Sequence, residues 1–313
     1  MVNSNIHKQK ISLAIVNYKK ANEVENLICQ FIIPGRREFI GEIIIINNFI
    51  GDVPVLDALK KRYDTDTVPI RIVHKSHNTY FVPALNEALR LAVYPYLLFS
   101  EPNFTIEKIN LEGLIMNLVD NAKYAGVAPR IKDSKGNTVI IGEGIITPWI
   151  AILRFMHMNK MLRIGPWKKF FQANRDTQKI EFPSLCNGFI LYNVSALREV
   201  GGFSRRLLMH YSENDIGRKV GGNGHVFLYD PSNTVIHDFG MASRQKGGNA
   251  WVMAMMIKDG FAHMDEGFGV TAAIAAIAVE FATRKWTMLP SIMKQLKAIQ
   301  GDYRTLQRAG EVD

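Results

Sequence analysis

Features that would place this chain in a special class of proteins are scarce. It has only two cysteines among 313 residues, Cys29 and Cys186, too few for a disulfide framework and without the spacing of a metal site. Its longest apolar run, Phe268 to Val279, is too short and too rich in alanine to span a bilayer. The polar start MVNSNIHKQK lacks the apolar core of a secretory signal. We therefore expect a cytoplasmic protein that no spanning helix anchors.

The composition is that of a globular protein with an excess of positive charge. Apolar residues make up 47% of the chain, enough for one large core or a core with an appendage. The net charge of +9 favours an anionic partner. Between residues 151 and 180, seven basic residues stand against one acid, Asp176, whereas the chain from Gly247 onward has seven of each sign. The positive charge is therefore concentrated in the middle of the chain.

The first hundred residues alternate between short apolar runs and amphipathic segments. The runs predict buried strands at residues 11–16, 42–46, 70–74 and 96–99. The segments between them predict helices from Ala21, over residues 53–63 and over residues 83–93. This alternation is typical of parallel strands joined by crossover helices. Ligands bind such sheets beyond the carboxyl ends of the strands, so the polar residues that follow each strand are candidate site residues.

The second half of the chain has a different pattern. Strand-like segments stand further apart, at residues 138–141, 188–192, 225–229 and 234–237. The sequence past Gly247 favours helices. Pro290 is suited to the start of a helix that carries several apolar residues on one face, namely Leu289, Ile292, Met293, Leu296 and Ile299.

A candidate cation site follows the fourth predicted strand, in the segment Ser100-Glu101-Pro102-Asn103. Side-chain oxygens two residues apart, directly after a buried strand, are able to face one hard cation. A surface turn is the alternative, because Glu-Pro-Asn is ordinary turn chemistry. A second acidic pair, Asp64 and Asp66, precedes the third strand and therefore lies at the wrong end of the sheet. We interpret that pair as part of a solvated loop.

The loop Tyr211-Ser-Glu-Asn-Asp215 holds two carboxylates, Glu213 and Asp215. A reaction in which an acceptor hydroxyl attacks needs one base to take its proton. The alternative is a helix start, with Ser212 as the cap and both acids in the first turn. The two interpretations are compatible. His237, at the end of a predicted strand, is either a structural residue or a metal ligand, a role that suits a neutral imidazole.

Three segments in the first half resemble motifs of family 2 glycosyltransferases, in particular those of the rhamnosyltransferase-like branch. Ile46-Asn-Asn-Phe-Ile-Gly-Asp52 resembles the VDNxSxD turn of that family. Asn78-Thr-Tyr-Phe-Val-Pro-Ala-Leu-Asn86 resembles its N-x-G-F-x-x-x-x-N segment. Glu101-Pro-Asn103 stands where the family carries Asn-Pro-Asp or Asp-x-Asp.

Two further segments continue the resemblance in the order expected for the family. Val200-Gly-Gly-Phe203 resembles the GGF segment before the catalytic loop. The stretch from Ser212-Glu-Asn-Asp215 to His237-Asp-Phe-Gly-Met-Ala-Ser243 is similar to the acidic motif E-D-x-D followed by H-x-x-G-x-S. Each segment is weak evidence, but five in order, over about residues 10–245, are strong.

The resemblance implies an inverting glycosyltransferase with a mixed α/β GT-A fold, in which helices flank a mostly parallel sheet. The implied domain covers residues 1–245, and a helical C-terminal extension over residues 246–313 packs on it. The side chains implied to bind a nucleotide sugar are Val16, Asn17, Tyr18, Asn47, Asn48, Asn78, Asn86 and Glu101. Mg²⁺ or Mn²⁺ is expected on the diphosphate, with the ligands Glu101, Asn103 and His237.

The resemblance also assigns the catalytic and acceptor residues. Glu213 takes the place of the catalytic Asp of the family and is expected to act as the base, with Asp215 contacting the acceptor or orienting the loop. Asn187 and Gly188 are expected to contact the acceptor. The chain departs from the family pattern at Glu213 and at two asparagines that replace aspartates, Asn47 and Asn103. Asn103 is a neutral ligand, so Glu101 would carry the negative charge of the metal site.

Two acceptor classes and one non-enzymatic role follow from these features. The expected donor is a UDP- or dTDP-linked sugar, and the leading acceptor is a glycan, often lipid-linked at the inner face of the membrane, where peripheral contact with the bilayer would help. The basic segment 151–180 also suits DNA with hydroxymethylated bases, because its cations would neutralise phosphates. A third alternative is an inactive transferase fold that serves as a sugar-binding or scaffolding protein.

Overall fold

One mixed sheet carries the fold. The computed structural model describes residues 9–139, 142–148, 150, 178–185, 188–237, 248–271, 273–274 and 289–313. Within these residues the main sheet has the strand order β3-β2-β1-β4-β10-β6-β11-β5, with β8 also paired to β11, and β7 pairs with β9 in a small second sheet. The strands are β1 (Ile11–Asn17), β2 (Ile40–Asn47), β3 (Ile70–His74), β4 (Tyr96–Ser100), β5 (Phe104–Lys108), β6 (Tyr124–Lys132), β7 (Gly142–Glu143), β8 (Ile180–Phe182), β9 (Ser184–Leu185), β10 (Phe189–Asn193) and β11 (Val226–His237).

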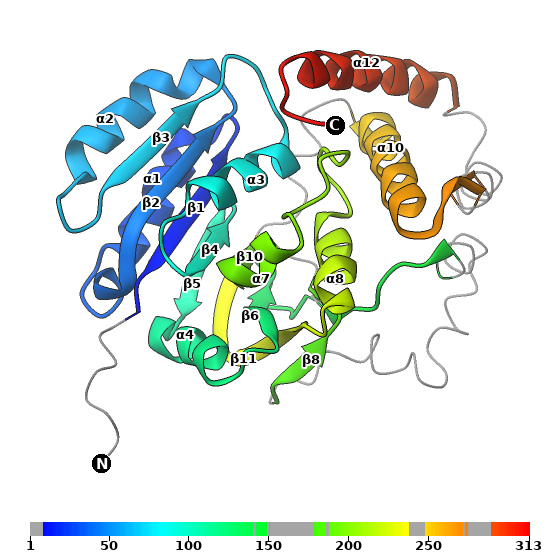
Figure 1. The fold of residues 1–313 in the computed structure, drawn as a ribbon. Coiled ribbons are helices and arrows are strands. Elements are labelled where there is room, and N and C mark those ends of the chain that lie inside the picture. The colour runs from blue at the N-terminus through cyan, green and yellow to red at the C-terminus, as the bar shows by residue number, and fades with distance from the viewer. Residues whose placement is uncertain are drawn as a thin grey trace.

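Helices connect these strands and cover the sheet (Figure 1). The central strands are apolar because they are covered on both faces, and all eight residues of β2 are buried. The amphipathic period predicted from Ala21 is confirmed, since the expected apolar face of α1 is fully buried. The helical elements are α1 (Ala21–Phe31), η1 (Arg37–Phe39), η2 (Ile50–Asp52), α2 (Val53–Tyr63), α3 (Phe81–Leu91), α4 (Leu111–Asp120), α7 (Val194–Glu199), α8 (Ser212–Gly222), α10 (Gly248–Phe268) and α12 (Leu289–Arg308).

The strand directions bring distant loops to one edge of the sheet. β1 to β4 pair in parallel, and β10 runs antiparallel between β4 and β6. β6 therefore points the same way as β4, and β11 is parallel to β6. The residues that follow β1, β2, β3, β4, β6 and β11 thus share one edge, which we call the carboxyl edge. β10 begins at this edge because it runs the opposite way.

The start of α8 also lies at the carboxyl edge. This helix ends at Gly222, four residues before Val226 starts β11 at the opposite edge of the sheet. Its first turn, with Ser212 and Glu213, therefore points back toward the carboxyl edge (Figure 1). The segments 101–103 and 212–215 are consequently brought to the same side of the molecule.

The C-terminal helices α10 and α12 pack together at the carboxyl edge, with the C-terminus beside them (Figure 1). They form a second apolar cluster with loop residues of the carboxyl edge. Its members include Tyr80 and Leu208 from the loops, and Trp251, Met255, Ile299 and Tyr303 from the two helices. Asp259 of α10 is fully buried and accepts hydrogen bonds from the backbone N–H groups of Leu208, Met209 and His210, at 3.0, 2.7 and 2.8 Å. Among the described residues, no helix has the length and hydropathy that crossing a bilayer requires.

The structure corrects four expectations about the elements. Residues 104–132 hold β5, α4 and β6, none of which we predicted. The segments 225–229 and 234–237 are one strand, β11, whose register shifts between Asp230 and Thr234. Thr138 forms only an isolated bridge to Lys132, although residues 140–141 lie outside the described ranges. Met293 does not join the buried face of α12, since it is 45% exposed.

Two of the predicted helices agree closely with the structure, whereas β7, β8, β9 and α7 were not predicted. α2 covers the expected residues 53–63, and Pro290 is the second residue of α12, where a missing N–H has no cost. The predicted boundary of the C-terminal extension, between residues 245 and 246, falls in a segment outside the described ranges and stays a prediction.

The buried carboxylate of Asp259 predicts a large loss of stability on substitution. Replacing it by alanine leaves three backbone N–H groups and the ammonium of Lys258, 3.1 Å away, without their acceptor. We expect Asp259→Ala to lower the free energy of unfolding by about 3–5 kcal/mol, as for other buried charges that lose a partner.

Chemical denaturation measures this loss, and Asp265→Ala on the same helix is the matched control. Asp265 pairs with Arg206 at 2.8 Å but both side chains are partly exposed, so its loss should cost about 1 kcal/mol or less. Equal losses in the two variants would contradict the role assigned to Asp259.

Candidate functional site

Glu101, Asn103 and His237, which come from two distant parts of the chain, meet at the carboxyl edge. Nε2 of His237 lies 2.8 Å from Nδ2 of Asn103 and 3.4 Å from Oε2 of Glu101. The imidazole is 7% exposed and stacks on Phe104, with the ring centres 4.3 Å apart. With the amide of Asn103 oriented in this way, Nδ2 donates and Nε2 of His237 accepts, which is the tautomer whose Nε2 lone pair binds metals.

The residues of this cluster have the chemistry of a divalent-cation site. Together they offer a carboxylate oxygen, an amide oxygen and an imidazole nitrogen, a set that suits Mg²⁺ or Mn²⁺. Only two of the three are acidic or histidine side chains. Within the part of the chain that the structure describes, no group of three or more His, Cys, Asp or Glu side chains is arranged to hold a metal ion.

Gly188 lies directly beneath Glu101. Its carbonyl oxygen accepts a hydrogen bond from the N–H of Glu101 at 2.8 Å, at the point where β10 starts beside the end of β4. A Cβ atom at position 188 would stand 2.6 Å from Oε1 of Glu101. Glycine is therefore required here for the carboxylate to keep its place. This contact gives Gly188 a role in positioning Glu101 that the sequence did not reveal.

Glu213 sits in the first turn of α8, and it is half-buried. Its Oε2 accepts a hydrogen bond from the hydroxyl of Ser212 at 2.6 Å. The N-terminal end of a helix carries partial positive charge, which favours the ionised carboxylate. Tyr211, the residue before this helix, has the left-handed backbone conformation with φ 63°. Sequence reasoning predicted this helix start, but it placed the cap at Ser212, whereas Tyr211 is the capping residue.

Asp215 does not face the carboxyl edge as an acceptor ligand would. It is fully buried, and its two oxygens accept from the backbone N–H of Ser204 at 2.8 Å and from Arg218 at 2.9 Å. Lys219 lies 3.5 Å from the same carboxylate. These bonds occupy Asp215 in holding α8 to the turn at Ser204. Of the two roles expected for it, orientation of the loop fits this packing and contact with the acceptor does not.

Three asparagines expected to bind the nucleotide are buried in the loops. Asn17 and Asn47 are 0% exposed and Asn48 is 3% exposed. The amide of Asn17 donates to Asn47 Oδ1 at 2.9 Å and to Asp52 Oδ2 at 2.8 Å. Asn48 donates to the carbonyl of Tyr80 and accepts from Thr79. These amide groups tie the loops after β1, β2 and β3 together, and the nucleotide contact expected of them stays a prediction.

Asn78 and Asn86 are also engaged within the protein. Oδ1 of Asn78 accepts from the N–H of Tyr80 at 3.0 Å and so shapes the turn before α3. Asn86, on α3, forms two hydrogen bonds with the backbone of Phe203, one from Nδ2 to its carbonyl and one to Oδ1 from its N–H, both at 3.0 Å. Asn86 thus fixes the Gly201-Gly202 turn to α3, and its expected contact with the nucleotide stays a prediction.

Tyr18 has neighbours that sequence reasoning did not single out. Its ring meets that of Phe49 edge-to-face, with centres 5.9 Å apart. The ammonium of Lys19 lies 4.9 Å from the centre of the Phe49 ring. Val16, the other predicted residue here, is partly exposed near the end of β1. Two rings and a cation at the ends of β1 and β2 are suited to a nucleotide base and its phosphates. In the sequence, the position of Phe49 directly after the Asn47-Asn48 turn is the feature that indicates this residue as part of the site.

The C-terminal helices hold two strained residues of the carboxyl edge. Tyr80 and Tyr211 both have positive φ, 68° and 63°, which bulky residues adopt only when the surroundings impose it. The hydroxyl of Tyr80 donates to Asp302 of α12 at 2.5 Å. Burial of the phenol raises its pKa, and this hydrogen bond raises it further. The ring of Tyr211 stacks on His263 of α10 with centres 5.4 Å apart. Burial lowers the pKa of His263, so the ring is neutral at pH 7.

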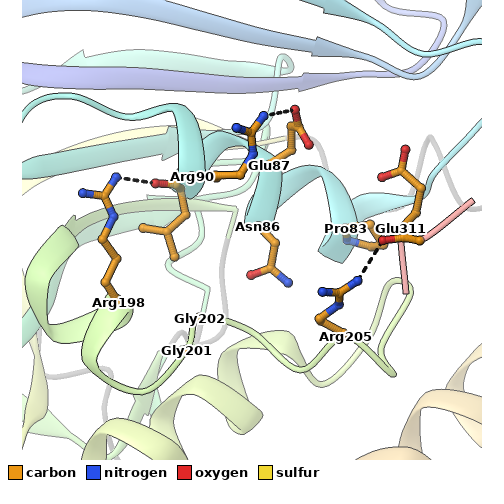
Figure 2. Close-up of a pocket in the computed structure, with 11 residues that line it drawn as sticks. Pro83, Asn86, Glu87, Arg90, Arg198, Gly201, Gly202, Arg205 and Glu311 are labelled. Atoms are coloured by element: carbon orange, nitrogen blue, oxygen red, sulfur yellow. Dashed lines mark hydrogen bonds and ion pairs between the residues drawn. The ribbon is translucent and has the colours of Figure 1, made fainter. Parts of the chain in front are cut away.

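A separate hollow of about 510 Å³ lies on the flank of the molecule rather than at the predicted metal residues. Figure 2 shows it between α3, the Gly201-Gly202 turn and the C-terminal residues Gly310 and Glu311. Of the predicted site residues, only Asn86 lines it. Arg205 closes one end by donating to the carbonyl of Gly310 at 2.8 Å. The hollow therefore lies where the C-terminal residues pack against α3 and the Gly201-Gly202 turn.

Several predicted features fall outside the described residues. Asn187, expected to contact the acceptor, is one of them. Most of the basic segment 151–180 and the residues that follow His237 in the H-x-x-G-x-S motif are others. The roles expected for them stay predictions.

Solved glycosyltransferases share this GT-A fold. GalNAc-T7 with UDP, GalNAc and Mn²⁺ matches with a TM-score of 0.57 and 14% identity over 79% of this chain and 46% of that chain. The mannosyltransferase PcManGT from Pyrobaculum calidifontis, in complex with GDP-Man and Mn²⁺, matches with a TM-score of 0.53 and 14% identity, over 96% and 83%. TarS 1-349 from S. aureus, in complex with UDP-GlcNAc, gives 0.52 and 13%, over 94% and 80%.

These likenesses establish the fold, and the sequence establishes the family. This chain spans less than half the length of the GalNAc-T7 chain and most of the length of the other two. No curated protein sequence matches it. Residues 13–201, more than half of the chain, match the family described as Glycosyl transferase family 2. The chain belongs to this family of glycosyltransferases.

Proposed function

We propose that the protein is an inverting glycosyltransferase that moves a sugar from a nucleotide-diphosphate donor to a hydroxyl group of a glycan acceptor. The observation that carries the proposal is the convergence of Glu101, Asn103 and His237 at the edge where α8 also presents Glu213. Solved proteins of the same fold hold UDP, GDP-Man or UDP-GlcNAc. Assignment to the rhamnosyltransferase-like branch rests on the order of the sequence motifs alone.

Glu101, Asn103 and His237 would hold a divalent metal. Mn²⁺ accompanies the nucleotide in the GalNAc-T7 and PcManGT structures. The bound metal would neutralise the diphosphate as it leaves, which is the chemistry such ions supply in transfer reactions. Glu101 is the only charged ligand of the set, since Asn103 stands where the family has a carboxylate. The position of the Glu101 carboxylate over Gly188 therefore determines where the negative charge of this site lies.

Glu213 would act as the general base. In an inverting transfer the acceptor oxygen attacks the anomeric carbon from the face opposite the diphosphate, the C–O bond to the diphosphate breaks, and the hydroxyl proton passes to the base. A carboxylate at the positive end of α8 would take that proton. Asp215, Asp259 and His263 would serve as positioning residues, because they fix α8 and the loop that precedes it.

Removal of the carboxylate of Glu213 tests its role. Glu213→Gln keeps the size and the hydrogen bond to Ser212 but loses the basic oxygen. We expect the rate of nucleoside diphosphate release from UDP-, dTDP- or GDP-linked sugars to fall roughly 100- to 10,000-fold, the usual contribution of a general base. Donor binding, followed by thermal shift, should be unchanged.

The control for this variant is Glu112→Gln. Glu112 is also a first-turn glutamate, but it belongs to α4, at the opposite edge of the sheet (Figure 1). It should retain the wild-type rate. A Glu213→Gln enzyme that releases the nucleotide at the wild-type rate would refute the assignment. No release by the wild-type protein with any donor would favour a sugar-binding or scaffolding role.

A thermal-shift measurement tests Glu101 as a metal ligand without relying on activity. In the presence of UDP, Mn²⁺ at one hundred times its dissociation constant should stabilise the wild-type protein by about 2.7 kcal/mol. Glu101→Ala should lose most of this gain, because the remaining ligands are neutral. Glu107→Ala, which removes an exposed carboxylate of β5, should keep it. Full metal-dependent stabilisation of Glu101→Ala would exclude Glu101 from the site.

Gly188→Ala provides an independent test of the same geometry. Its new Cβ would displace the carboxylate of Glu101, whose side chain is 37% exposed and free to swing outward. We expect the variant to fold with near wild-type stability but to lose the stabilisation by Mn²⁺ and UDP. Gly221→Ala, at a helical position with no atom within 4 Å, is the control. Equal metal responses in both variants would show that Glu101 does not need its present position.

A further inference from the structure

The outer face of α12 carries four positively charged side chains, in two pairs about two turns apart. Lys294, Lys297, Arg304 and Arg308 are all exposed. At 3.6 residues per turn they fall within about 80° of the helix circumference and extend over roughly 21 Å along its axis. Figure 1 shows α12 at the outside of the molecule, beyond the carboxyl edge. The four cations therefore form a linear, solvent-facing array, which we call the α12 stripe.

In the part of the chain that the structure describes, the charges of the α12 stripe have no carboxylate partner. Among the described residues, none of the four forms an ion pair with a carboxylate, whereas Arg206, Arg218 and Lys258 nearby are all paired. The only acidic residue of α12 is Asp302, which accepts the hydroxyl hydrogen bond of Tyr80. Four cations on one helix face without counter-charges repel one another, and that repulsion is relieved by an anionic surface.

We propose that the α12 stripe docks the protein on an anionic lipid bilayer. Cations on one face of an amphipathic helix bind the phosphates and carboxylates of acidic headgroups. Met293 borders the stripe and is 45% exposed, although it is a large apolar side chain. In a bilayer it would insert among the acyl chains beside the headgroups, so the face combines charge attraction with apolar burial.

The same face is poorly suited to a single-stranded nucleic acid. Proteins that hold single strands stack bases on exposed aromatic rings, but Tyr303, the only aromatic residue of α12, is 9% exposed. The exposed Met293 together with these cations fits a lipid surface better than a phosphate backbone.

Docking through α12 would place the candidate site near the bilayer. The helix is tied to the carboxyl edge by Tyr80 and Asp302, and the C-terminal tail is tied by Lys75 to Glu311 at 2.9 Å. The lipid-docking inference stands on α12 alone. Only its use, to bring the enzyme to a lipid-linked acceptor, rests on the proposed function.

Vesicle co-sedimentation of the full chain tests the inference. The probes are phosphatidylcholine vesicles with and without phosphatidylserine, at low and high salt. A variant with Lys294, Lys297, Arg304 and Arg308 all changed to Gln should bind the acidic vesicles less tightly by about fivefold per cation, on the order of several hundredfold together. Wild-type binding should require phosphatidylserine and weaken with salt.

The control variant loses the same charge elsewhere. It changes four exposed cations outside α12 to Gln, namely Lys61, Arg71, Lys108 and Lys135, and it should bind vesicles like the wild type. Equal binding of both variants, or no wild-type binding to acidic vesicles, would overturn the inference. Tighter binding to duplex DNA than to vesicles, lost in the α12 variant, would also overturn it. Donor hydrolysis in solution should be unchanged in the α12 variant, so failure of the docking is distinguished from failure of the proposed function.

Discussion

The candidate site depends on the backbone hydrogen bond from the N–H of Glu101 to the carbonyl of Gly188, which joins the end of β4 to the start of β10. β10 runs against its neighbours, so its first residue, and not its last, meets the end of β4. Because residue 188 has no side chain, the carboxylate of Glu101 lies over it and reaches His237. The antiparallel insertion thus brings into contact residues that are 87 and 136 positions apart from Glu101 in the chain.

The loops of the carboxyl edge are rigid because buried polar groups satisfy one another. Asn17, Asn47 and Asn48 use their amide groups to link three consecutive strand ends. Asp215 and Asp259 do the same for the loop before α8, each through backbone N–H groups. A buried polar group that loses its partner is costly, so each link resists local opening. This rigidity suits a site that must hold a diphosphate and a hydroxyl group in a fixed relation.

The C-terminal helices hold two loops of the candidate site in place. Through Asp259 and His263, α10 fixes the backbone that leads to Glu213, and through Asp302, α12 fixes Tyr80. Both anchored segments contain a tyrosine with positive φ, a strained conformation that persists only where tertiary contacts impose it. The outer side of α12 makes none of these contacts. It therefore carries the exposed positive charges through which we propose that the protein binds an anionic membrane.

The sequence alone determined the alternation of strands and helices in the first hundred residues and the order of the family motifs, because apolar period and motif spacing are local properties. It indicated Glu101, Asn103, His237 and Glu213 through their position after predicted strands or in an acidic loop, and resemblance assigned their roles. Tertiary structure decided which polar residues face outward. Asn17 and Asn86 look like ligands in the sequence, yet the amide groups of the buried Asn17 and the partly exposed Asn86 are hydrogen-bonded within the protein. No local pattern marks Asp259 or Gly188, since their roles exist only where remote segments pack together.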